Sequence, residues 1–215
     1  MPNADVAKVM LPAATLYVYT VYMKPATTAE KIVRAAHRLF DREGAEAVTM
    51  RRVAEAVGIT PMAIYRHFPD RDALLKRVSD DSFEAVAQEW AQRSHDPDIA
   101  RRLLSTHELY LDYALAHPHL FEHAFAVRRD NARRFPEDFR ARRSPTLNVI
   151  ADALADGMRQ GVLREDDPWE LAMTFWAHAH GLIVLYRAGR FSYDEKTFRR
   201  FYLSSIGRLL DGIKN

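Results

Sequence analysis

A short run of residues in the first third of the chain carries side chains suited to contacts with nucleic acid. Tyr65, His67 and Arg71 can each donate a hydrogen bond to a phosphate oxygen. Met62 and Ala63 are apolar and suit contacts with thymine methyl groups in a major groove. The full set of predicted DNA contacts is Thr49, Arg51, Thr60, Pro61, Met62, Ala63, Tyr65, Arg66, His67 and Arg71.

The spacing of the segment TMRRVAEAVGITPMAIYRHF, at 49–68, predicts two short helices that meet at a steep angle. The first helix ends at Gly58, because glycine relieves the strain of a left-handed turn residue. The second begins at Thr60 and Pro61, since proline is best tolerated at the first helical position. Such a second helix fits a major groove about 12 Å wide. The inside of the corner is expected to be packed by Val53, Val57, Ile59 and Ile64.

The other members of the set have supporting roles in this interpretation. The Thr49 hydroxyl or Arg51 would hold the flanking strand, and Arg66 would read guanine if it reaches a base. The same spacing also fits a helical corner inside a protein core, in which Tyr65 and Phe68 would be packing residues.

Residues 27–77 resemble the N-terminal domain of the TetR family of bacterial transcription regulators. The resemblance rests on TMRRVAEAVGITPMAIYRHFPDRDALL at 49–75. In that family the positions that match Tyr65, His67 and Arg71 contact the DNA backbone, and lysine is usual where Arg71 stands. The resemblance implies a homodimer that represses transcription from a palindromic operator and leaves it when a small molecule binds.

Two positions depart from the pattern of that family. Pro61 and Met62 are apolar, whereas family members often carry lysine, arginine, glutamine or serine near these positions. An alternative therefore stays open, in which the chain is a small-molecule-binding helical protein without operator DNA binding.

The remainder of the chain, residues 73–215, is far longer than DNA binding requires. Its aromatic residues and histidines suit either core packing or a small-molecule pocket with a few polar groups. The segment WAHAHGLIVLYRAGRF, at 176–191, resembles a C-terminal type of the same family marked by a Trp and a His–Gly pair, here Trp176, His180 and Gly181. We predict an apolar or aromatic effector bound by His107, Tyr110, Tyr113, Phe121, Phe125, Trp176 and His180.

The last two expected helices, at 167–189 and 194–213, are predicted to form a homodimer interface. Two helices from each subunit would make a four-helix bundle, and a two-fold dimer matches a palindromic operator. The alternative is that this face packs only within its own subunit. The final helix contributes Phe198, Phe201, Tyr202, Ser205, Ile206 and Leu209, with Ser204 and Gly207 permitting close approach.

Helical periodicity runs from Thr27 almost to the end of the chain, and nothing indicates a strand. The sequence thus predicts an all-α fold of about nine helices, with an N-terminal three-helix domain that contains a helix-turn-helix and a C-terminal helical domain for ligand binding and dimerisation. The expected divisions are a flexible or weakly ordered arm at 1–24, a DNA-binding domain at 25–72 and the C-terminal domain at 73–215. Caps, prolines and glycines place the other helices at 27–44, 70–94, 98–117, 119–127 and 145–160. We expect Gly44 to end the first of these in a left-handed cap.

Composition narrows the class of protein. Of 215 residues, 48% are hydrophobic and 28% are charged, which is ordinary for a soluble globular protein. The net charge is only +2, but residues 25–77 hold ten Lys or Arg against seven Asp or Glu, a small basic excess that favours a polyanionic partner. No stretch is long enough to cross a bilayer or resembles a signal peptide. We expect a cytoplasmic protein with no membrane partner.

Neither a metal site nor an active site is expected. The chain has no cysteine, which excludes disulfides and cysteine-ligated metal. His117, His119, His123, His178 and His180 have loose spacing, and no carboxylate pattern accompanies them. We find no nucleophile elbow, P-loop, dinucleotide fingerprint or HExxH motif, so we expect no catalytic residue, no cofactor and no enzyme activity.

An arginine-rich stretch, from Arg128 to Arg143, has seven arginines and three acidic residues. We interpret it as a solvated loop between helices, because charge runs of this kind favour water. A DNA contact there is disfavoured, since the family docks DNA from the opposite end.

Overall fold

A computed structural model describes residues 26–93, 95–126 and 132–215, without the side chains of Arg93, Phe125 and Ala126. The arm predicted at 1–24 and the beginning of the arginine-rich stretch lie outside these residues. The described chain confirms the all-α fold class and contains ten α-helices and one 3-10 turn. The helices are α2 (Thr28–Glu43), α3 (Met50–Val57), α4 (Pro61–Tyr65), α5 (Arg71–Arg93), α6 (Ile99–Ala116), α7 (Pro118–Ala126), α8 (Glu137–Arg140), α9 (Pro145–Arg159), α10 (Pro168–Arg187) and α11 (Glu195–Asp211), and the 3-10 turn is η1 (Ala45–Ala47).

Side-chain caps fix where most of these helices begin. The Thr27 hydroxyl accepts a hydrogen bond from the Glu30 amide, and the Glu30 carboxylate accepts one from the Thr27 amide, so α2 begins with the expected capping box. Asp98, Asp167 and Asp194 accept hydrogen bonds from the first free amides of α6, α10 and α11 in the same way. Local sequence therefore sets the boundaries from which the functional surfaces are built.

The N-terminal part of the molecule, which we call the head, consists of α2, η1, α3, α4 and the first two turns of α5. Its core includes the fully buried side chains of Ile32, Phe40 and Val53. Leu120 of α7 also belongs to this core, although it lies far along the chain. The head is thus completed by a residue from the C-terminal part of the chain.

The rest of the molecule, which we call the body, has a second and larger core. Helices α6, α9, α10 and α11 pack around it, and Leu111, Leu154 and Phe175 are among its buried residues. Helix α5 is shared, because Leu74, Leu75 and Val78 lie in the core of the head while Trp90 lies in the core of the body. One continuous helix therefore connects the two cores.

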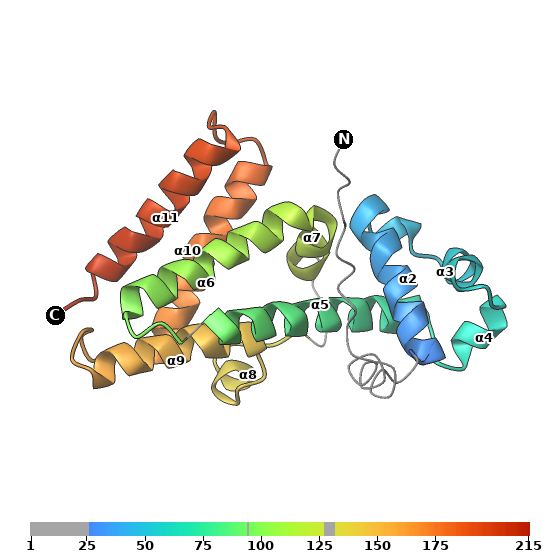
Figure 1. Ribbon diagram of the computed structural model, residues 1–215, viewed down its shortest axis with the longest axis horizontal. Coiled ribbons are helices and arrows are strands. Elements are labelled where there is room, and N and C mark those ends of the chain that lie inside the picture. The colour runs from blue at the N-terminus through green and yellow to red at the C-terminus, as the bar shows by residue number, and fades with distance from the viewer. Residues whose placement is uncertain (1–25, 94, 127–131) are drawn as a thin grey trace, which may run out of the picture.

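The molecule is elongated, with the head at one end and the α10–α11 pair at the other (Figure 1). Helices α3 and α4 form the outer edge of the head, and α5 runs from the head along the body. No described helix is long and apolar enough to cross a membrane.

Two local features differ from expectation. Residues 137–140 of the arginine-rich stretch, predicted as loop, form the single-turn helix α8, because Phe139 packs into the core of the body. Gly44 does end α2, but with φ +83° and ψ 178° it is not in the left-handed helical conformation that we expected. That region is open essentially only to glycine.

Candidate functional site

Helix α4 presents an exposed outer face and is held by its inner face. The Thr60 hydroxyl accepts a hydrogen bond from the Ala63 amide at 3.3 Å, and Pro61 follows at the first position, so the helix begins as predicted. Ile64 is completely buried, whereas Met62 is 70% exposed and Tyr65 is 48% exposed. A short helix anchored on one side and bare on the other has the shape that a groove-binding helix needs.

The turn before α4 has the geometry that the sequence predicted. Gly58 adopts the left-handed conformation, with φ +75° and ψ 36°, and its amide donates to the carbonyl of Ala54 at 2.9 Å. Val53 is fully buried, and Val57 and Ile59 pack against the core of the head. The alternative was a helical corner inside a core, with Tyr65 and Phe68 as packing residues. It does not hold for Tyr65, because Phe68 is buried but Tyr65 is exposed.

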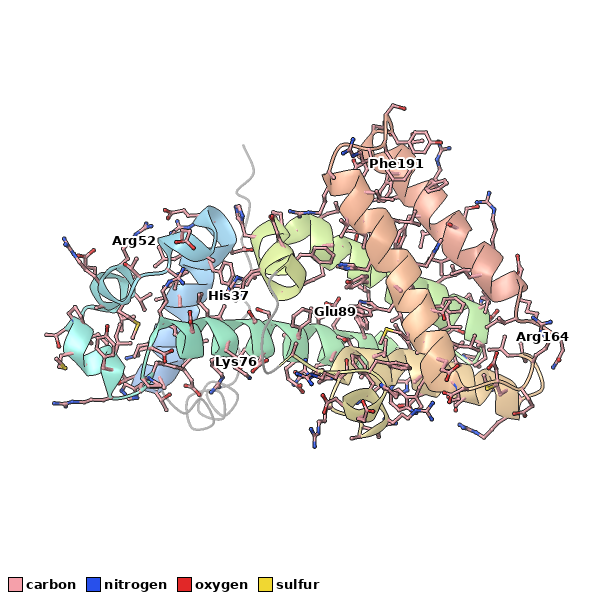
Figure 2. The ribbon with its side chains drawn as sticks, turned by 180° about the vertical axis from the view of Figure 1, so that it is seen from behind. His37, Arg52, Lys76, Glu89, Arg164 and Phe191 are labelled. Carbon is pink, nitrogen blue, oxygen red and sulfur yellow. The ribbon has the colours of Figure 1, made fainter. Side chains whose placement is uncertain are left out.

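The remaining predicted contacts surround α4 on the same part of the head. Arg66 and His67 follow it and are exposed. On α3, Thr49 caps the helix by accepting from the Arg52 amide at 3.2 Å, and exposed Arg51 pairs with Glu55 at 3.0 Å. Figure 2 shows Arg52 at the end of the molecule that the head occupies. The predicted contacts therefore lie on α3 and α4 or close to these helices in the sequence.

Arg71 differs from the other arginines of the set because backbone carbonyls of the head hold its guanidinium group. Its Nε donates to the carbonyl of Val48 at 2.8 Å, and its Nη2 donates to the carbonyl of Ala45 at 2.6 Å. These bonds tie the start of α5 to the link between η1 and α3. The phosphate contact of Arg71 stays a prediction, and its structural role was not visible in the sequence.

The body contains a cavity of about 360 Å³ between α5, α6, α9 and α10. Three of the seven residues predicted to bind a ligand line it, namely Tyr110, Tyr113 and Trp176. The rest of its apolar wall comes from side chains that we had not singled out, among them Phe83, Trp90, Phe139, Leu147 and Ile150. The cavity is thus mostly apolar and aromatic, as small-molecule sites usually are.

Tyr110 links the wall of the cavity to two residues of α10. The indole Nε1 of Trp176 donates to its hydroxyl at 3.1 Å, and that hydroxyl lies 3.0 Å from Nδ1 of His180. Because the hydroxyl already accepts from the indole, its own hydrogen is available to Nδ1, which is then unprotonated. Burial lowers the pKa of His180 and raises that of Tyr110, so both groups are neutral near pH 7. The ring of Phe121 lies 5.2 Å from that of His180.

His107, Phe121 and His180 do not line the cavity directly, and the side chain of Phe125 lies outside the described part of the molecule. His107 is buried in the body, with its Nδ1 2.7 Å from the carbonyl of Leu103. Its Nε2 has no partner among the described residues. Burial lowers the pKa of His107 to about 4, so the ring is neutral.

A polar part of the cavity wall was missed from the sequence. Lys76, Ser79 and Asp80 come from α5, and Arg133, Ser144 and Thr146 come from the segment around α8 and the start of α9. No local signal distinguishes these residues from ordinary surface polar residues. Only the packing of α5 against α9 turns them towards a common space.

The α10–α11 pair requires one correction. Phe198, Tyr202 and Ile206 are fully buried in the core of their own subunit, because they form the inner stripe of α11. They were predicted to face a partner subunit and do not. Ser205 lies 2.8 Å from Nε2 of His178 and links α11 to α10. The exposed apolar side chains of this end are Val184, Leu185 and Tyr193, with Phe191, Phe201 and Leu209 half-buried beside them.

The histidines considered as metal ligands are engaged in pairwise contacts. His117 Nδ1 lies 2.8 Å from Asp41 Oδ1, and the ring of His123 packs edge-on against Phe40. His119 faces Gly44 of the head. Within the described residues, no group of three or more His, Asp or Glu side chains is placed to hold a metal ion.

Two family models match most of the described chain. The model of bacterial regulatory proteins of the tetR family matches residues 32–78, which span the head. The model of the tetracyclin repressor-like C-terminal domain matches residues 103–205, which include the Trp176 and His180–Gly181 segment.

Individual proteins are similar to this chain in part of the sequence or in fold. The HTH-type transcriptional repressor DrrR1 of Streptomyces coeruleorubidus is 40% identical over 57 residues, which are 26% of this chain and 21% of that protein. A TetR-family transcriptional regulator from Pectobacterium atrosepticum has a similar fold, with a TM-score of 0.68 and 21% identity over 88% of this chain and 98% of the other. The regulator FadR of Bacillus subtilis, solved in complex with stearoyl-CoA, has a TM-score of 0.67 and 14% identity over 85% of this chain and 98% of the other.

Proposed function

This chain belongs to the TetR family of bacterial regulatory proteins, and from that premise we propose that it is a DNA-binding transcription regulator, a repressor that a small molecule releases from its operator. The observation that carries the proposal is the outer face of α4. A helix with Met62 and Tyr65 exposed and Ile64 buried beneath them serves no packing purpose on its outer side. It suits insertion into a major groove.

We assign the DNA contacts according to their chemistry. Tyr65 and His67 bind phosphate oxygens. Met62 and Ala63 contact thymine methyl groups, and Arg66 is placed to read guanine. Thr49, Arg51, Thr60, Pro61 and Arg71 flank this set, and the DNA-binding domain spans residues 25–72.

The proposed functional unit is a homodimer formed by the last two helices of residues 73–215. Val184, Leu185 and Tyr193 supply exposed apolar surface at that end, opposite the head (Figure 1). A two-fold dimer would place two α4 helices about 34–36 Å apart, one turn of DNA, and would therefore bind a palindrome. We place this activity in the cytoplasm, where bacterial DNA is accessible.

The effector, in this proposal, is an apolar or aromatic molecule that enters the cavity. Trp90, Tyr110 and Trp176 give that space an aromatic wall, and α5 connects it to the head. A ligand that fits one arrangement of α5 better than another shifts the equilibrium between them, which changes the spacing of the two heads. The binding of stearoyl-CoA by FadR of Bacillus subtilis supports a ligand site within this fold.

Sequencing of the DNA fragments that the purified protein retains tests the proposal. We expect enrichment of one palindromic sequence, and loss of that enrichment in the variant Met62→Glu, whose charge would face DNA without disturbing the buried side of α4. Retention of DNA without any shared sequence, or equal enrichment by the variant, would overturn it.

The apolar character of Pro61 and Met62 favours one second candidate, a helical protein that binds a small molecule but no operator. In that case, no fragment would be retained at any salt concentration, while ligands would still bind the cavity. The fragment experiment therefore separates the two functions.

A further inference from the structure

Part of the cavity lining is polar, and one of its buried groups has no partner among the described residues. Ser79 of α5 belongs to this lining and is only 5% exposed. Its Oγ has no hydrogen-bond partner among the described residues. A buried hydroxyl without a partner costs free energy, unless a bound molecule or water supplies one.

The N-terminus of α9 lines the same cavity. Ser144 precedes the helix without capping it through its side chain, and Pro145 occupies the first position. The amides of Thr146 and Leu147 have no acceptor within the part of the chain that the structure describes. Free amides at the start of a 15-residue helix, together with the helix dipole, attract a negatively charged group.

The charged residues of the cavity lining also favour a negatively charged group. Lys76 and Asp80, both on the cavity wall, pair with each other and cancel. Arg133 also lines the cavity and has no ion pair among the described residues. Among the described lining residues, one positive charge is therefore uncompensated. Figure 2 shows Lys76 on α5, on the side of the head.

Most of the remaining cavity lining is apolar. Trp90, Ile150 and Trp176 belong to it, and Phe139 packs beside them. A ligand that fills both parts must be amphipathic. We propose that the cavity binds an organic carboxylate with an aromatic or aliphatic body, whose carboxylate accepts hydrogen bonds from Ser79 and from the amides at the start of α9. This inference rests on the proposed function, because it names the class of effector for the same cavity.

The position of Ser79 connects this chemistry to the head. The preceding residue, Val78, is fully buried in the core of the head, whereas Ser79 belongs to the lining of the cavity. A carboxylate bound by Ser79 and α9 would therefore hold α5 against the body. The contact on α5 would lie one residue from Val78, which belongs to the core of the head. Ser79 is thus a specificity-determining residue of the ligand site and also lies where a ligand can move the head.

Two probes of matched shape test the inference. 4-Phenylbutyrate carries a carboxylate, and 4-phenylbutanamide replaces it by a neutral amide of the same size. Binding to the full chain is followed by tryptophan fluorescence, because Trp90 and Trp176 are on the cavity wall. We expect the carboxylate to bind about tenfold more tightly than the amide, since charge-assisted hydrogen bonds are about twice as strong as neutral ones.

Variants locate the effect. Ser79→Ala should weaken binding of the carboxylate about tenfold. Arg133→Gln, at an exposed position where folding is not at risk, should weaken it severalfold and reduce its salt dependence. Ser105→Ala is the matched control, because the Ser105 hydroxyl donates to the carbonyl of Arg102 in its own helix and does not line the cavity. It should leave both affinities unchanged.

Equal or tighter binding of the amide would overturn the inference, as would carboxylate binding that neither Ser79→Ala nor Arg133→Gln changes. Failure of the proposed function has a separate signature, because DNA retention is measured without any probe. A protein that retains a palindrome but prefers the amide refutes the carboxylate alone. One that prefers the carboxylate but retains no DNA refutes the regulator alone.

Discussion

Tyr65 offers the simplest test of backbone contacts at the level of a single residue. It is half exposed on α4, so Tyr65→Phe removes one hydroxyl without creating a cavity. We expect operator binding to weaken by about 1 kcal/mol per head, and binding to unrelated DNA to weaken equally, because a phosphate contact carries no sequence information. Fluorescence anisotropy with operator and scrambled DNA measures both.

The matched control is Ser105→Ala, which also removes one hydroxyl but does so in the body, where the Ser105 hydroxyl donates to the carbonyl of Arg102. It should leave both affinities unchanged. A loss confined to the operator would show that Tyr65 reads a base. Arg71→Ala is a weaker test of phosphate binding, because Arg71 also holds the carbonyls of Ala45 and Val48, and its removal should destabilise the head.

His107 predicts how stability depends on pH. Burial lowers its pKa to about 4 in the folded chain, against 6.5 when unfolded. As the pH falls, the unfolded chain therefore binds this proton before the folded chain does. The stability that depends on a neutral His107 is fully present above pH 6.5 and is lost as the pH falls from 6.5 to 4. The loss amounts to about 3 kcal/mol. Urea unfolding at pH 7, 5.5 and 4 would measure it.

His107→Gln removes the titration and should flatten this part of the stability profile, even if the variant is less stable at pH 7. His67→Gln, at an exposed position on the head, serves as the control and should keep the steep profile of the natural chain. Equal slopes in all three proteins would contradict the assignment to His107.

At the level of elements, the turn between α3 and α4 depends on Gly58. Its φ of +75° is unfavourable for other residues, and no atom lies within 4 Å of the position that a Cβ would take. Gly58→Ala should therefore cost about 1–2 kcal/mol of unfolding free energy from the backbone alone. Gly58→Asn should recover much of that loss, since asparagine tolerates this conformation. Similar losses in both variants would point to a steric cause instead.

Element boundaries were predictable because their signals are local. Each signal acts within a few residues of the helix end that it marks. The starts of α2, α3 and α4 are marked by Thr27 with Glu30, by Thr49, and by Thr60 with Pro61, and the end of α3 is marked by Gly58. Features that depend on distant packing were not predictable. Helix α8 forms because Phe139 packs into the core of the body, and that core is made by residues distant in sequence.

The candidate site divides in the same way. Exposure of Met62 and Tyr65 follows from the periodicity of α4 around buried Ile64, and the sequence anticipated it. The engagement of Arg71 and the orientation of Ser79 depend on partners that are distant in sequence. For α11, helical spacing identified an apolar stripe but could not tell whether it faces its own subunit or another.

At the level of the whole molecule, dimerisation is predicted to depend on the outer face of α10 and α11. Leu185 is 48% exposed there, so Leu185→Glu should fold normally but place a charge in the proposed interface. We expect a monomer in analytical ultracentrifugation and a large loss of affinity for the palindrome, because the two heads are then no longer linked.

Met62→Glu provides the contrast, since it introduces the same charge at the opposite end of the molecule. It should remain dimeric and lose only DNA binding. A Leu185→Glu protein that stays dimeric would move the interface to another surface.

Leu120 has a consequence for protein engineering. It comes from α7, yet it is 2% exposed and completes the core that surrounds Phe40 and Ile64. A chimera that grafts residues 26–78 onto the effector domain of another regulator would leave a hole where this side chain belongs, unless the host offers an equivalent leucine. The choice of host should therefore depend on its counterpart of α7 as much as on the point of fusion.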